Sequence, residues 1–111
     1  MKKVQLNILH KILALLLLLT GFLSAQELLI TGTLRDSTDN ALCIGANIKL
    51  KKVLAEQNPS YTTTNNKGYF EFLSVKPSRY LLEITFVGYN KYSDTIRIGR
   101  RNFNLGNIIM V

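Results

Sequence analysis

The chain has 111 residues, of which 47% are hydrophobic, and its 14 basic and 7 acidic side chains give a formal net charge of +7. This length suits one small globular domain and leaves no room for a second. A single cysteine and a single histidine exclude an internal disulfide and a zinc site built from several such ligands.

The N-terminus combines a basic start with an apolar run. The run is unbroken from Ile12 to Leu19, and the small residue Ala25 suits a cleavage site. This pattern predicts a helical signal peptide over residues 1–25, cleaved before Gln26, and a domain over residues 26–111. The alternative is a transmembrane anchor, for which a bilayer needs roughly 20 apolar residues. We therefore expect an exported protein.

Removal of the signal peptide lowers the net charge, because three cations leave and the domain keeps 11 basic and 7 acidic residues, a balance of +4. These cations are spread along the chain. Two local groups stand out, namely Lys49, Lys51 and Lys52, and Arg97, Arg100 and Arg101. On alternating strands such groups are more typical of a solvated face than of a binding patch, and we expect no nucleic-acid partner.

The first half of the domain alternates between apolar strands and polar loops. Alternation from Gln26 to Leu34 predicts a strand, in which Gly32 marks a bulge or a close packing contact. A loop of short polar side chains follows, and alternation resumes from Ile44 to Lys51. Residues 53–60 are expected to form a loop that leads into a strand from Tyr61 to Thr64.

Two turn signals separate the next alternating runs. The segment from Asn65 to Gly68 supplies residues that tolerate left-handed backbone, so a tight reversal is predicted there. Phe70 and Phe72 then share one face of a strand. A second turn is predicted at Pro77-Ser78-Arg79. The strand after it has an apolar face made of Tyr80, Leu82, Ile84 and Phe86.

The last part of the chain contributes a half-buried strand through Tyr92 and Ile98, a polar break at residues 100–102, and a closing strand from Phe103 to Val111. Seven short strands with turns at this spacing predict an all-β, seven-stranded Greek-key sandwich of the transthyretin and immunoglobulin type. Truncation of a core side chain to alanine would cost roughly 2 to 5 kcal/mol. The expected core includes Phe70, Phe72, Leu82, Ile84, Phe86 and Ile96.

No catalytic constellation is visible in the sequence. The acids do not cluster as a pair, and the only histidine, His10, lies in the predicted signal peptide. Asp36, Asp39 and Asn40 invite comparison with a calcium loop, but the bidentate glutamate and further oxygen ligands are missing, so a turn is favoured. Cys43 is interpreted as a small buried apolar side chain rather than a reactive thiol. We expect no enzymatic activity, metal or cofactor.

Five tyrosines raise the alternative of a sugar-binding platform. Tyr80 lies on the apolar face of its strand and Tyr89 follows Gly88, so both are expected in the core. Tyr69 faces away from the phenylalanines of its strand and is the candidate ligand contact.

Four blocks in this order resemble the carboxypeptidase regulatory-like domain, a transthyretin-like sandwich. They span 32–48, 64–70, 77–89 and 104–108 and cover nearly all of the domain. The motif residues are Gly32, Asp36, Gly45, Ala46, Gly68, Phe70, Pro77, Tyr80, Gly88 and Tyr89. The chain departs from the family pattern with Leu42 for proline, Asn65 for aspartate and Ser78 for glycine. Because glycine adopts positive φ easily, Ser78 is expected to change the turn type or to bear strain.

The resemblance implies a non-catalytic domain of the kind found at the N-terminus of Bacteroidetes-type TonB-dependent outer-membrane receptors. It implies a location in the periplasm or at the outer membrane and contact with a receptor or energy-transducing protein during nutrient uptake. We expect a truncated receptor or a free-standing form. The alternatives are a glycan-binding or adhesion module and an accessory subunit that steadies an enzyme. Edge strands of so small a sandwich also permit binding by strand addition.

Overall fold

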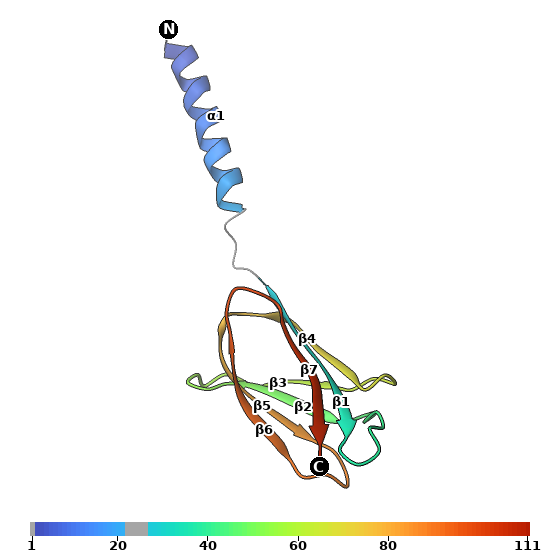
Figure 1. The fold of residues 1–111 in the computed structure, drawn as a ribbon. Helices are drawn as coiled ribbons and strands as arrows, with labels where there is room; N and C mark the ends of the chain where they lie inside the picture. The colour runs from blue at the N-terminus through green and yellow to red at the C-terminus, as the bar shows by residue number, and fades with distance from the viewer. Residues whose placement is uncertain (1, 22–26) are drawn as a thin grey trace.

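The computed structural model describes residues 2–21 and 27–111. Helix α1 covers Lys2–Gly21 (Figure 1). The predicted cleavage point between Ala25 and Gln26 lies outside the described residues. Among the described residues, no helix combines the length and the apolarity that a membrane span requires.

The domain consists of seven strands in two sheets, which confirms the predicted all-β sandwich (Figure 1). One sheet has the order β4-β1-β7 and the other the order β3-β2-β5-β6. Strands β1 and β7 run parallel, and the other paired strands are antiparallel. The bounds are β1 Leu28–Asp36, β2 Asn47–Lys52, β3 Ser60–Thr63, β4 Tyr69–Val75, β5 Ser78–Thr85, β6 Tyr92–Ile98 and β7 Phe103–Met110.

Among the described residues, the core is contributed by positions from Leu28 to Met110, and its members alternate most clearly along β1 and β5. The side chains of residues 7–16 in α1 are exposed. The sandwich therefore contains its own complete core and needs no side chain described in α1. Its buried apolar residues are Leu28, Ile30, Leu34, Cys43, Ala46, Ile48, Leu50, Phe70, Phe72, Val75, Tyr80, Leu82, Ile84, Ile96, Ile98, Ile108 and Met110.

Most of the expected core is confirmed, but Phe86 and Tyr89 are only partly buried. Strand β5 ends at Thr85, so Phe86 leaves the alternation that buries Ile84. Its ring instead stacks on Tyr89 with centroids 5.5 Å apart and an interplanar angle of 10°. The core prediction was wrong for Phe86 because the strand stops one residue before it.

Strand β2 begins at Asn47, later than the predicted start at Ile44. Gly45 has φ +80, which breaks the extended backbone before the strand can form. The buried Thr64 side chain holds this kink: its hydroxyl donates to the carbonyl of Cys43 at 2.7 Å and accepts from the amide of Ala46 at 2.9 Å. Ile44 is consequently exposed.

Gly32 makes the close packing contact that the sequence indicated. A Cβ at this position would lie 2.6 Å from Cε1 of Phe70, a ring that is itself fully buried. The strand β7 beside it carries a bulge, since Thr31 pairs with Asn104 and Thr33 with Asn107. The bulge falls at Gly106, whose φ is +67.

Candidate functional site

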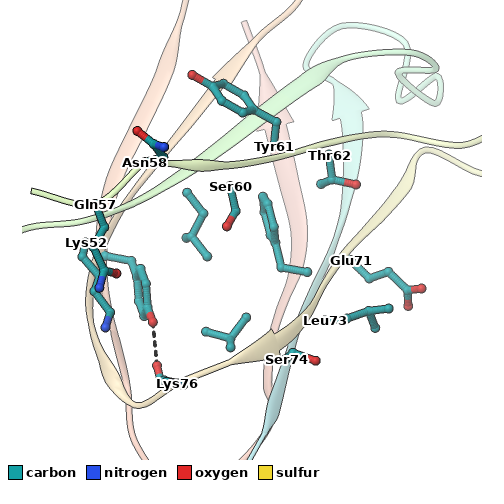
Figure 2. Close-up of a pocket in the computed structure, with 14 residues that line it drawn as sticks. Lys52, Gln57, Asn58, Ser60, Tyr61, Thr62, Glu71, Leu73, Ser74 and Lys76 are labelled. Atoms are coloured by element: carbon teal, nitrogen blue, oxygen red, sulfur yellow. Dashed lines mark hydrogen bonds between the residues drawn. The ribbon is translucent and has the colours of Figure 1, made fainter.

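A cleft of about 480 Å³ opens along one side of the sandwich, between β3 of one sheet and β4 of the other (Figure 2). The two strands leave the turn at 64–68 and diverge to opposite sheets (Figure 1). The lining residues are Leu50, Lys52, Gln57, Asn58, Ser60, Tyr61, Thr62, Glu71, Phe72, Leu73, Ser74, Val75, Lys76 and Tyr80.

The floor of the cleft is apolar and its rim is polar. Leu50, Phe72, Val75 and Tyr80 are buried core residues that reach the floor. The Tyr80 hydroxyl donates to the carbonyl of Lys76 at 2.7 Å, the bond drawn in Figure 2, and burial raises the pKa of this phenol. A floor of this kind offers hydrophobic contact without an exposed charge, while the rim supplies hydrogen-bonding groups.

The strands on either side of the cleft each have an unpaired edge. Among the described strands, β3 pairs only with β2, and β4 only with β1. The amide of Thr64 donates to Ala46, and its carbonyl accepts from Gly45, so Thr64 faces β2. Because antiparallel strands alternate the direction of their backbone groups, those of Tyr61 and Thr63 point away from β2. The cleft is thus bordered by backbone that can pair with an added strand.

The turn that sets the cleft is built by Asn65. Its side-chain oxygen accepts from the amide of Lys67 at 2.9 Å and from that of Tyr69 at 3.1 Å. Gly68 has φ +67, and its carbonyl accepts from the amide of Leu34 at 2.8 Å, which fastens the turn to β1. Asparagine keeps the acceptor oxygen that aspartate would supply, so the departure from the family pattern leaves the turn intact.

Of the two outcomes expected at Ser78, the turn changes and this residue does not take positive φ. Ser78 is the first residue of β5, and positive φ falls instead on Ser74, with φ +55. Ser74 lies in a bulge of β4, where Leu28 pairs with Val75 but Ile30 pairs with Phe72. The chain reverses here through the bulge and the short Lys76-Pro77 link, so no left-handed residue is needed at Ser78.

A second group of motif residues meets at the end of β1. The Tyr89 hydroxyl donates to Oδ2 of Asp36 at 2.5 Å, while Oδ1 accepts from the amide and hydroxyl of Thr38 and from the amide of Asp39. These bonds, led by that of the Thr38 hydroxyl, hold the pKa of Asp36 far below its usual range. The hydrogen bond to Asp36 in turn raises the pKa of Tyr89.

This arrangement favours the turn over the calcium loop. Oδ1 of Asp36 accepts from the amides of Thr38 and Asp39, Oδ1 of Asp39 accepts from the amide of Ala41, and Asn40 adopts φ +58. The described residues contain no group of three or more histidine, cysteine or acidic side chains able to hold a metal ion.

The remaining predicted residues serve packing or backbone geometry. Ala46 is fully buried in the core, Pro77 lies in the link between β4 and β5, and Gly88 has φ +90 beside Tyr89. Tyr69, the predicted ligand contact, is half-buried, and its hydroxyl donates to Glu71 at 3.2 Å.

Tyr61 is the exposed aromatic side chain that the sequence pattern did not single out. It is 69% exposed and pairs with Lys49 across β2 and β3. Figure 2 shows its ring on the opposite side of β3 from Ser60, which points into the cleft. The alternation of β3 could have identified it, since the neighbour Thr62 is half-buried.

A family model for the carboxypeptidase regulatory-like domain matches residues 29–110. None of the curated proteins compared with the chain matches it significantly in sequence.

Solved structures share the fold at low sequence identity. The Bacillus anthracis TIE protein has a TM-score of 0.62 at 18% identity, and the match covers 77% of this chain and 16% of that one. The group B streptococcus pilus 2b backbone protein has a TM-score of 0.59 at 20% identity, covering 74% of this chain and 40% of that one. Catechol 1,2-dioxygenase from Pseudomonas arvilla C-1 has a TM-score of 0.55 at 12% identity, and the match covers 67% of this chain and 36% of that one. The chain spans less than half of each relative, and the likeness concerns the fold alone.

Proposed function

Because this chain belongs to the carboxypeptidase regulatory-like domain family, we propose that it is an exported, non-catalytic sandwich that contacts a protein partner at the outer membrane. In this proposal the domain works in the periplasm, as the N-terminal domain of a TonB-dependent receptor does during nutrient uptake. The partner is the receptor or an energy-transducing protein. The observation that carries the proposal is the cleft between β3 and β4, which combines two unpaired strand edges with an apolar floor.

Strand addition is the binding mode that this geometry favours. An extended peptide would pair with the backbone of Tyr61 and Thr63, and its alternate side chains would enter the cleft over Phe72 and Val75. Strand β3 is only four residues long, so backbone pairing would be limited. Most of the affinity would then come from side chains seated on the apolar floor.

The proposal is tested by capture with the domain of residues 26–111. The bait is incubated with solubilised outer-membrane proteins, and the retained proteins are identified by mass spectrometry. Thr63→Pro removes an amide from the free edge of β3, whereas the bonds from β3 to β2 use the residues on either side. Thr63→Val is the matched control, because it keeps this amide.

We expect the wild type and Thr63→Val to retain a TonB-dependent receptor or an energy-transducing protein, and Thr63→Pro to lose it while circular dichroism confirms its fold. Retention of the same partner by Thr63→Pro would overturn strand addition at β3. Failure of all three baits to retain any such protein would overturn the proposed function.

A glycan-binding or adhesion module is the second candidate, and the exposed ring of Tyr61 favours it. Gln57 and Asn58 lie nearby on the cleft rim, and their amides suit sugar hydroxyls. A glycan array distinguishes the two candidates. Binding that is lost in Tyr61→Ala and kept in Tyr69→Ala would support the module, whereas an array without signal would remove it.

A further inference from the structure

Members of the two basic groups that are separate in sequence, namely Lys49, Lys51 and Arg97, meet on one face of the larger sheet. Strand order brings β2, β5 and β6 together, so Lys49 and Lys51 lie on the same outer surface as Arg79 and Arg97. Lys91 joins them through its ion pair with Glu83. We call these residues the basic face: Lys49, Lys51, Arg79, Lys91 and Arg97.

This face carries the whole net charge of the domain. It holds five cations and one anion, Glu83. Over residues 27–111, the remaining side chains comprise six cations and six anions. The charge is therefore concentrated on one side of the sandwich, which gives the domain a directional electrostatic field.

The cations on this face are poorly compensated within the domain. Arg79 lies directly opposite Arg97 on adjacent strands, and both are exposed. Like charges in this position are destabilising. Glu83 contacts Lys49 at 4.0 Å and Lys91 at 3.3 Å, and no described acid forms an ion pair with Lys51, Arg79 or Arg97. Stability of the isolated domain does not explain this arrangement.

We propose that the basic face docks the domain onto an anionic membrane surface. Five cations, four of them on adjacent strands about 4.8 Å apart, can contact several lipid phosphates at once. Leu81 is the only apolar side chain among the outward positions of β2, β5 and β6, and it is half-buried. The exposed ring of Tyr61, which pairs with Lys49, lies on β3 at the edge of the sheet and not at the centre of this face. A protein interface would be expected to have aromatic or aliphatic anchors at its centre, so a charged lipid surface is the better fit.

This proposal is independent of the partner contact proposed above, because it uses a face of the sheet rather than the cleft at its edge. The experiment measures binding of residues 26–111, which contain the complete core, to sedimented vesicles. One set is pure phosphatidylcholine and the other also contains phosphatidylglycerol. The face variant is Lys51→Gln/Arg79→Gln/Arg97→Gln. The control, Lys67→Gln/Lys76→Gln/Arg101→Gln, removes the same charge from exposed positions elsewhere.

Each cation near an anionic surface increases binding about fivefold, so the face variant should bind the anionic vesicles about a hundredfold more weakly than the wild type. We expect the control variant to bind the anionic vesicles less than about tenfold more weakly than the wild type does. We also expect wild-type binding to disappear at high salt, which screens the charges. Equal losses in both variants would overturn the proposal, because only net charge would then matter. Binding to polyglutamate without binding to vesicles would also overturn it and would indicate an acidic protein partner.

A single substitution separates binding from stability. Arg97→Glu replaces a like-charged cross-strand pair with an opposite one, so this variant should melt at the same or a higher temperature than the wild type. Its binding to anionic vesicles should nevertheless fall more than tenfold, because the substitution lowers the net charge of the face by two units. Unchanged vesicle binding in this variant would contradict the proposal.

Discussion

The Tyr89 hydroxyl donates a hydrogen bond of 2.5 Å to Oδ2 of Asp36, a residue 53 positions earlier in the chain. The bond ties the β5–β6 connection to the end of β1, in the opposite sheet. The same phenol ring stacks on Phe86. One tyrosine therefore fastens the two sheets together at the end of the sandwich where β1 finishes.

The first prediction is that the stability of the domain depends on pH in the acidic range, because of the carboxylate of Asp36. Hydrogen bonds from Thr38 and Tyr89 lower the folded-state pKa below the ordinary 3.8. A depressed folded pKa means that the carboxylate stabilises the fold above the ordinary value, and that this contribution disappears as the pH falls toward the folded value. We expect the melting temperature of the wild type to fall more steeply from about pH 5 to pH 2 than that of Asp36→Asn.

The control for this measurement is Asp39→Asn, which removes a carboxylate that accepts only a local bond from Ala41. Because Asp36 accepts hydrogen bonds from both Thr38 and Tyr89, Asp36→Asn should change the pH profile of the melting temperature more than Asp39→Asn does. Parallel pH profiles for the wild type and Asp36→Asn would contradict the assignment of the acid-sensitive group to Asp36.

A second prediction concerns the contact of Gly32 with Phe70. Gly32→Ala should destabilise the domain by about 1 to 3 kcal/mol, because the new Cβ would lie 2.6 Å from a ring that is buried and has no room to move. Chemical denaturation measures this cost. Phe70→Leu removes the outer part of the ring, so Gly32→Ala should cost less in that background. An equal cost in both backgrounds would show that the ring is not the obstacle.

Much of the fold could be predicted because its signals are local. Alternation placed Phe70, Leu82 and Ile84 in the core, and the residues from Asn65 to Gly68 identified the turn. These features depend on the side-chain period of a strand and on which residues accept left-handed backbone.

What the sequence did not reveal depends on contacts between distant residues. Ser74 takes positive φ because β4 needs a bulge to match β1, and nothing in the local sequence marks the position. Likewise, the sequence did not show that Lys51 and Arg97 lie on the same face, because strand order decides which outward side chains are neighbours. The cleft has the same origin, since β3 and β4 join different sheets.

A third prediction concerns the reactivity of Cys43. The side chain is 1% exposed, and burial raises the pKa of its thiol. Since the thiolate is the reactive form, a thiol reagent at neutral pH should label the native domain far more slowly than the denatured one. Labelling followed by mass spectrometry measures both rates. Comparable rates in native buffer and in denaturant would contradict the buried, inert assignment.

The last prediction concerns the hydroxyl of Thr64, which connects two backbone groups ahead of β2. It donates to the carbonyl of Cys43 and accepts from the amide of Ala46, and the side chain is only 4% exposed. Thr64→Val keeps the shape but leaves both groups buried without this partner, at a cost of about 2 to 4 kcal/mol. Thr64→Ser keeps the hydroxyl and should lose less stability in the same denaturation experiment. If valine were tolerated as well as serine, the bend at Gly45 would be held by packing rather than by these hydrogen bonds.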